Sequence, residues 1–154
     1  MLGAGADGRL YLVDEWRWDS KLQRRQLTDA EYSERLRAWL GDDRPQWICV
    51  DPSAASFSLQ LHRDGLHATA AENSVLDGIR LVSSLLARGL LVVHESCEGW
   101  ISEVTGYSWD DKAAAQGEDR PIKVDDHSLD AGRYAIATTE VLWRPLIRSS
   151  LDAA

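Results

Sequence analysis

The chain has 154 residues, and its composition of 44% hydrophobic and 27% charged residues is typical of one globular domain with its own core. Its formal net charge of −8 argues against strong unaided binding to nucleic acid, because that affinity comes mainly from lysines and arginines that neutralise phosphates. No apolar run approaches the roughly 18 residues of a membrane span, and there is no signal-peptide pattern. We therefore expect a cytoplasmic protein without a membrane partner. The two cysteines lack the spacing of a disulfide framework or a zinc cluster.

The first residues predict a turn followed by a strand. Met1 to Gly8 are small and turn-like, and Arg9 to Trp18 alternate loosely between apolar and polar residues, which favours an extended run. Asp14 and Glu15 lie on this predicted strand. Glu15 is the better candidate for supporting a nearby site, and the alternative for both is a surface charge of the sheet.

A capping box predicts the first helix. Thr28 and Glu31 have the spacing at which each side chain accepts a hydrogen bond from the other residue's backbone N–H, and Gly41 ends the helix after Leu40. Its predicted buried stripe consists of Tyr32, Leu36, Trp39 and Leu40.

The middle of the chain alternates strands with helices. The continuous apolar run Trp47–Val50 predicts a strand buried on both faces, and Asp51 stands at its carboxyl end. The elements predicted after it are a helix over Ser53–Arg63, a brief strand over His67–Ala70, a helix that Ser74 caps and Gly89 ends, a strand over Leu90–Val93 and a helix over Ser96–Val104.

The last part of the chain predicts a loop and a helix. Asp110 to Arg120 are polar without hydrophobic periodicity, which favours an exposed loop. Asp126 is predicted to cap a helix that runs to Thr139. The tail from Trp143 either packs or frays. The residues predicted to share one face of the helix are Leu129, Gly132, Arg133 and Ile136.

Strands alternating with helices predict an α/β domain with a mixed sheet flanked by helices. We expect Trp47–Val50 to be the central strand and to run parallel to Leu90–Val93, because the helices between them supply the required crossover.

The best candidates for metal-binding or catalytic residues lie at the start of the last predicted helix. His127 and Asp130 are at i and i+3 and share a face, so they could bind a divalent cation or simply complement the positive end of the helix dipole. Asp51 would add a second carboxylate if its strand ends beside this helix, although taken alone it is better explained as an Asx-turn residue. Such oxygen-rich ligands suit magnesium or manganese in phosphoester hydrolysis.

Other residues have simpler explanations. Lys123, Arg133 and Arg120 lie near the predicted site and could contact phosphate, but we favour ordinary solvated surface charges. The tryptophans are expected to pack in the core rather than to stack on bases, since several, such as Trp47, fall on apolar faces.

In this order the segments resemble the nuclease domain of the large subunit of tailed-bacteriophage DNA-packaging terminases, over most of the chain. The residues that carry the resemblance are Val13-Asp-Glu15, Val50-Asp-Pro-Ser-Ala54, Ala71-Glu-Asn-Ser-Val75 with Gly78-Ile79, Glu103-Val-Thr-Gly-Tyr107 with Trp109, and above all Lys123 through Tyr134 with its Asp-His-x-x-Asp-Ala core.

This resemblance implies a ribonuclease H-like fold and a metal-dependent endonuclease that hydrolyses phosphodiester bonds of concatemeric double-stranded DNA. Asp51, His127 and Asp130 would be its catalytic and metal-binding residues, with Mg²⁺ or Mn²⁺ as cofactor and His127 as a ligand or a proton-transfer partner. The implied partners are DNA, bound weakly by this chain alone, and the terminase ATPase domain or other packaging proteins. The chain itself contains no G-x-x-x-x-G-K-[ST] phosphate loop.

The family pattern also implies a first central strand that ends in another metal-binding aspartate. The residues before Arg9 are too few for a strand, an acidic end and a return turn, so we expect a single nuclease-like domain over residues 1–154 that lacks this strand and cuts poorly. The gap would be closed by pairing of the neighbouring strands, by Met1–Gly8 or by a homodimer, and we favour a homodimer over an open monomer. The alternative function is that of an inactive prophage remnant, serving at most as a structural or protein-binding module.

Overall fold

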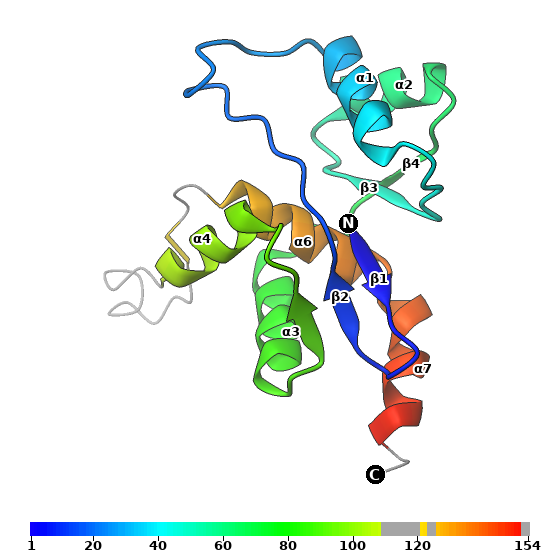
Figure 1. Cartoon of the computed structure of the whole chain (residues 1–154), viewed down its shortest axis with the longest axis vertical. Helices are drawn as coiled ribbons and strands as arrows, with labels where there is room; N and C mark the ends of the chain where they lie inside the picture. Colours follow the sequence, from blue (N-terminus) through cyan, green and yellow to red (C-terminus); the bar gives the residue numbers. More distant parts are fainter. Residues whose placement is uncertain (109–120, 123–125, 152–154) are drawn as a thin grey trace. The chain divides into compact units, whose positions relative to one another are not determined.

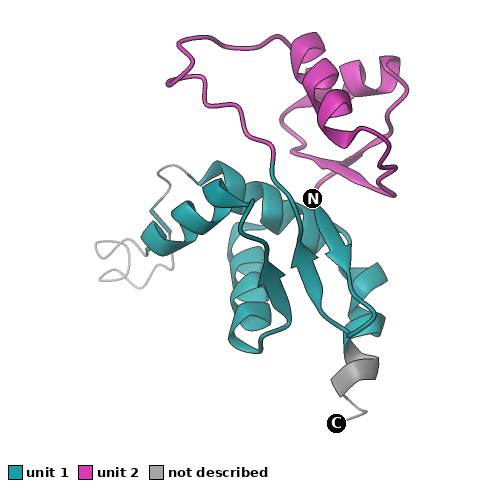
Figure 2. Cartoon of the chain, viewed as in Figure 1, with its two compact units in different colours: residues 1–15, 73–154 teal, residues 16–72 magenta. Residues whose placement is uncertain are grey.

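The computed structural model describes residues 1–108, 121–122 and 126–151, and side chains as far as residue 147 (Figure 1). The chain forms two compact units (Figure 2). Unit 1 consists of Met1–Glu15 and Asn73–Ala154, and unit 2 consists of Trp16–Glu72. Unit 2 is therefore one continuous stretch of chain that interrupts unit 1, and each unit is described by itself.

Unit 1 contains a mixed three-stranded sheet with β2 (Leu10–Leu12) in the middle. On one side, β1 (Leu2–Ala4) pairs antiparallel with β2, and on the other side β5 (Leu91–Val93) pairs parallel with it. The helices of unit 1 are α3 (Val75–Ala87), α4 (Glu98–Gly106), α6 (His127–Thr138) and α7 (Glu140–Leu151).

The hydrophobic core of unit 1 forms between this sheet and its helices. Its buried members are Leu10, Leu12, Leu85, Leu90, Leu91, Cys97, Trp100, Ile136, Trp143 and Ile147. The tail packs rather than frays, because Trp143 of α7 is buried and its indole Nε1 donates a hydrogen bond of 2.8 Å to the Ile136 carbonyl. The four residues of α6 that were predicted to share one face do so, and this face turns inward: Gly132, Arg133 and Ile136 are buried, and Leu129 packs against the core.

Unit 2 pairs two helices, α1 (Asp29–Leu40) and α2 (Ala55–Arg63), with a parallel two-stranded sheet of β3 (Ile48–Val50) and β4 (Ala68–Ala70). The predicted capping box is confirmed: the Thr28 hydroxyl accepts from the Glu31 N–H, and the Glu31 carboxylate accepts from the Thr28 N–H. Gly41 ends α1 with a positive φ of 54°, a conformation that glycine adopts without strain.

The prediction for the start of the chain is wrong in part. Leu2–Ala4 form a strand rather than a turn, because the Asp7-Gly8 turn folds the chain back and the Gly5 N–H donates to the Arg9 carbonyl at 2.8 Å. The strand predicted over Arg9–Trp18 is also much shorter, since β2 ends at Leu12. Leu2–Ala4 pair with β2, as one of the three closures of the predicted gap requires, whereas direct pairing of β2 with the Trp47–Val50 strand is not among the described pairings.

The predicted strand order is also corrected. β3 pairs with β4 in its own sheet, and β5 pairs with β2, so Trp47–Val50 is not a central strand beside Leu90–Val93 among the described pairings. The short helix α2 supplies the crossover that parallel pairing requires, and it brings β4 beside β3. Nor is this strand buried on both faces: Val50 is buried, but Trp47 is 46% exposed.

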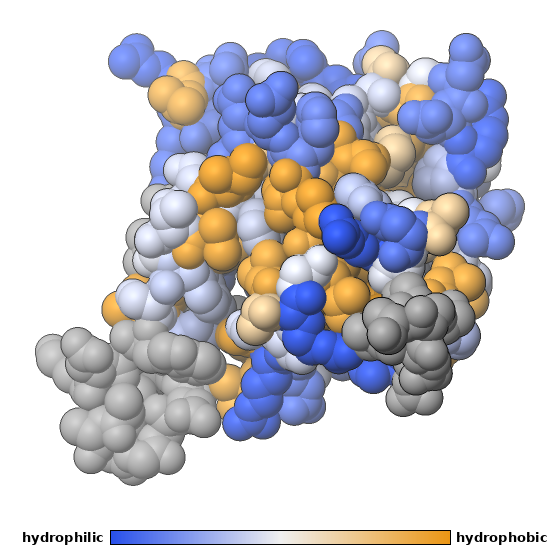
Figure 3. All heavy atoms as spheres, turned by 60° about the horizontal axis from the view of Figure 1, so that its bottom comes forward, coloured by the Kyte–Doolittle hydropathy of each residue, from blue (hydrophilic) through white to orange (hydrophobic). Residues whose placement is uncertain are grey.

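The predicted α/β class with mixed strand pairing is confirmed, with six helices in the described part of the chain. None of the helices within those residues has the length and apolar character needed to cross a lipid bilayer. Apolar side chains do reach the surface, as one face of the molecule shows (Figure 3). The most exposed of the large ones in unit 1 is Val141 on α7, at 80%.

Candidate functional site

The first turn of α6 carries the predicted pair. His127 is exposed at the surface and Asp130 is partly buried, one turn further along the same helix. The Asp130 N–H donates to the Asp126 carbonyl at 2.8 Å, so Asp126 does occupy the position before the helix. Its side chain, however, makes no capping hydrogen bond. The prediction that the Asp126 carboxylate caps this helix is therefore wrong.

The cap comes instead from Glu103 on α4. Its carboxylate Oε2 accepts hydrogen bonds from the backbone N–H groups of Ser128 at 2.8 Å and Leu129 at 3.0 Å. These are among the donors that a helix leaves unpaired at its start, and a negative charge there also complements the helix dipole. Glu103 is buried, so two hydrogen bonds offset the cost of removing its charge from water. No sequence spacing predicts this contact, because the partners lie on different helices.

Glu15 performs the same task for α4. Its Oε2 accepts from the N–H groups of Gly99 at 2.9 Å and Trp100 at 3.1 Å. A Cβ on Gly99 would lie 2.9 Å from Glu15 Oε1, so only glycine allows this close approach. Glu15 is thus neither a sheet-surface charge nor a group at the predicted site itself. It fixes α4, whose Glu103 in turn fixes the first turn of α6.

Arg133 is the least expected member of the site. Its Nη2 donates to Asp130 Oδ1 at 2.6 Å and its Nε donates to the same oxygen at 3.3 Å. The Arg133 side chain is only 5% exposed and that of Asp130 24%. The prediction of a solvated surface arginine is therefore wrong. Lys123 and Arg120, the other basic residues named for this role, lie outside the described residues.

Asp126, just before α6, has an unusual buried carboxylate. It is 8% exposed, and its Oδ2 has no hydrogen-bond partner among the described residues. Burial raises the pKa of the Tyr107 phenol, and the negative charges of Asp126 and Asp130 raise it further. Carboxylate oxygens and an imidazole nitrogen are ligand types that magnesium and manganese accept.

Asp51 stands at the carboxyl end of β3, as predicted, but in unit 2. Its Oδ1 accepts from the Ser53 N–H at 2.8 Å, and its carbonyl accepts from the Ala54 N–H at 2.9 Å. This is the Asx-turn that the sequence left open as an alternative, and it leads the chain into α2.

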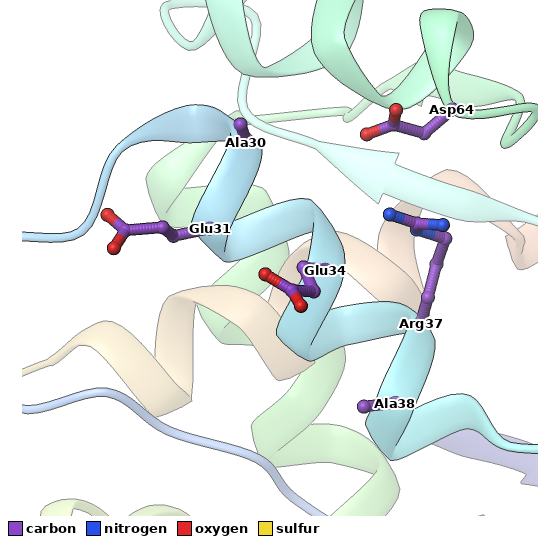
Figure 4. Close-up of a pocket in the computed structure, with 6 residues that line it drawn as sticks. All are labelled: Ala30, Glu31, Glu34, Arg37, Ala38 and Asp64. Atoms are coloured by element: carbon purple, nitrogen blue, oxygen red, sulfur yellow. The ribbon is translucent and has the colours of Figure 1, made fainter.

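No group of three or more potential metal-ligating side chains gathers within the ranges that the structure describes. A surface hollow does occur in unit 2, along α1 (Figure 4). None of the predicted site residues lines it, and two of its charged side chains already have structural contacts. Glu31 belongs to the capping box, and Asp64 accepts from the Ser33 hydroxyl at 2.6 Å. We assign it no function.

The α/β fold is that of the class of ribonuclease H-like domains. Residues 7–138 match the family described as the terminase RNaseH-like domain, and the chain belongs to that family. Over 133 residues it is 28% identical to the terminase large subunit of Escherichia phage T5, covering 82% of this chain and 28% of that subunit.

Solved structures agree with this assignment. The large terminase of a thermophilic bacteriophage in complex with ATP-γ-S superposes with a TM-score of 0.81 and 40% sequence identity, over 85% of this chain and 34% of that chain. A further structure of the large terminase from the same phage gives a TM-score of 0.81 and 35% identity, over 92% of this chain and 39% of that chain. The chain therefore spans well under half the length of the terminases that it matches.

Proposed function

We propose that the chain is a metal-dependent endonuclease domain of a phage DNA-packaging terminase, acting on the phosphodiester bonds of concatemeric double-stranded DNA. The observation that carries the proposal is the first turn of α6, which holds an exposed imidazole and a fixed carboxylate in a chain of the terminase family. Asp51 at the end of β3 is proposed as the second carboxylate.

Each residue has a proposed task. Asp130 and Asp51 would hold Mg²⁺ or Mn²⁺ through carboxylate oxygens, which these cations prefer. His127, exposed at the surface, would complete the ligand set or pass a proton to or from the reacting phosphate oxygens. A bound cation would supply charge stabilisation at the phosphate and a water more easily deprotonated than bulk water.

The proposed partners are double-stranded DNA and the rest of a large terminase subunit. This chain covers only 28% of the T5 subunit. In an assembled motor, an ATPase domain and other packaging proteins would contact it. A homodimer is the further proposed assembly, and light scattering of the chain would test it.

Calorimetric titration with Mn²⁺ tests the site. We expect Asp130→Asn and Asp51→Asn each to weaken Mn²⁺ binding by about tenfold or more, because loss even of groups that only support a ligand costs that much. Asp42→Asn, which changes an exposed aspartate outside the site, is the matched control and should bind as the wild type does. Plasmid nicking in Mn²⁺ should fall in parallel with binding. If all four proteins bind and cut alike, the proposed site is wrong.

The alternative, an inactive structural or protein-binding module, has one observation in its favour. Oδ1 of Asp130 is already engaged by Arg133, as in a purely structural ion pair. In that case neither aspartate variant would change Mn²⁺ binding, while Asp130→Asn would still lower the free energy of unfolding.

A further inference from the structure

The Asp130–Arg133 pair is placed where a divalent cation is proposed to bind. Both guanidinium hydrogen bonds to Asp130 end on Oδ1, at 2.6 and 3.3 Å. Arg133 donates neither of these hydrogen bonds to Oδ2, so Oδ2 is the oxygen to which a divalent cation would bind. A carboxylate that accepts a bound arginine on one oxygen already has its charge balanced before any metal arrives.

The guanidinium is held firmly in this position by other parts of unit 1. Its Nη1 donates to the Ser74 carbonyl at the start of α3, at 3.1 Å, and its central carbon lies 4.7 Å from the centre of the Tyr134 ring. The arginine stem crosses α3 at Gly78, where a Cβ would lie 2.6 Å from Arg133 Cδ. A residue fixed at so many points will not swing away when a cation binds.

We propose that Arg133 is a resident counter-charge that positions Asp130 in the absence of metal and lowers the affinity of the site for divalent cations. This inference rests on the proposed metal-binding function. A fixed positive charge next to a ligand oxygen repels an arriving cation, and in a partly buried site this repulsion is only weakly screened by water. Arg133 would thus stabilise the metal-free fold at the expense of metal affinity.

Two substitutions separate the charge of Arg133 from its shape. Arg133→Met keeps an apolar stem and removes the charge, so it leaves Asp130 unpaired in a partly buried place. Arg133→Lys keeps the charge but cannot reach Asp130 and the Ser74 carbonyl with one planar group. Arg88→Met, which changes an exposed arginine after α3, is the matched control.

The test measures Mn²⁺ affinity by calorimetry. It also measures the urea concentration at which half of the full chain is unfolded, which we call the urea midpoint, with and without Mn²⁺. We expect Arg133→Met to lower the midpoint without metal, to bind Mn²⁺ about tenfold more tightly, and to gain more stability from Mn²⁺ than the wild type does. Arg133→Lys should also lower the midpoint, but its affinity should stay within about threefold of the wild type. Arg88→Met should change neither quantity.

An Arg133→Met protein that folds but binds Mn²⁺ no more tightly than the wild type would overturn the inference, since a merely structural arginine predicts that result. If Arg133→Met does not fold without metal, Arg133→Gln is the second neutral variant, and folding of either upon addition of Mn²⁺ would support the inference. Failure of both to fold in Mn²⁺ would overturn it. If the wild type binds no Mn²⁺, both the proposed function and this inference are wrong. If Mn²⁺ binding depends on Asp130 but is unchanged when the charge of Arg133 is removed, only this inference is wrong.

Discussion

Glu15 and Glu103 show how single residues from outside a helix can fix where it begins. Each carboxylate accepts two backbone N–H groups of a helix to which it does not belong. The residues just before those helices, Cys97 and Asp126, provide no side-chain cap. Without the two glutamates, the first donors of α4 and α6 would be left partly buried and unpaired.

We predict that Glu103→Gln lowers the free energy of unfolding by about 1–3 kcal/mol, because an amide oxygen replaces a charged acceptor of two hydrogen bonds. The substitution keeps the shape of the side chain, so packing changes little. Urea unfolding followed by circular dichroism measures the loss. Glu95→Gln, at an exposed position just before α4, should stay close to the wild type. Equal stabilities of the two variants would show that the negative charge of Glu103 contributes nothing to stability.

At this scale the sequence predicted which residues share a turn of a helix, but not which residues of other elements they contact. His127 and Asp130 share the first turn of α6, as their spacing predicts. The burial of Arg133 could not be predicted, because it depends on Gly78 and the Ser74 carbonyl of another helix. Sequence periodicity describes the faces of one element and contains no information about which element packs on that face.

At the scale of elements, α1 and α2 of unit 2 are joined by a hydrogen bond between Ser33 and Asp64. Ser33 is fully buried on α1, and its hydroxyl donates to Asp64 Oδ2 at the end of α2, at 2.6 Å. Gln60 donates to the same oxygen at 3.0 Å. The Ser33 hydrogen bond, followed by that of Gln60, lowers the pKa of Asp64.

The lowered pKa predicts a pH dependence. A carboxyl group with a lower pKa in the folded state contributes stability above its unfolded pKa, near 3.9, and this contribution is lost as the pH falls through the folded value. We therefore expect Ser33→Ala to be less stable than the wild type at pH 7, with a difference that narrows at about pH 3. The urea midpoints of wild type and variant at the two pH values measure this difference in stability. Ser56→Ala, on the exposed face of α2, is the control. A difference that widens in acid would contradict the assignment.

Helix boundaries were predicted well and strand partners poorly, for a physical reason. Thr28 and Gly41 bound α1 through local hydrogen bonds and backbone conformation, which neighbouring residues determine. The described strands are three residues long, too short for their pattern to specify a partner. The parallel pairing of β3 with β4 follows from the α2 crossover rather than from the residues of β3.

At the scale of the whole molecule, the net charge of −8 limits what the chain can do alone. We predict that it binds double-stranded DNA with a dissociation constant weaker than about 1 µM at physiological salt, because its 25 acidic residues outnumber the 17 lysines and arginines that could replace counterions at the phosphates. Fluorescence anisotropy with a labelled duplex measures this, and repetition at low salt should tighten binding. Nanomolar affinity at physiological salt would show that a basic surface exists despite the overall charge.

The division into two units had no signature in the sequence. Neither junction, Glu15 to Trp16 or Glu72 to Asn73, falls in a stretch rich in proline, glycine or serine, and composition does not change across them. What the sequence did predict at this scale was the α/β class and the family, through motifs that lie in both units.

The pairing of β2 with β5 has a consequence for the order in which the chain folds. Leu10 pairs with Leu91, so the central sheet of unit 1 cannot form until the chain has closed a loop that contains all of unit 2. Closing a long flexible loop costs entropy and slows folding, whereas unit 2 is continuous and has only local contacts to make. Once unit 2 has folded, most of the residues in that loop are no longer flexible, so closing the loop costs less entropy. Weakening unit 2 should therefore slow the assembly of a sheet that contains none of its residues.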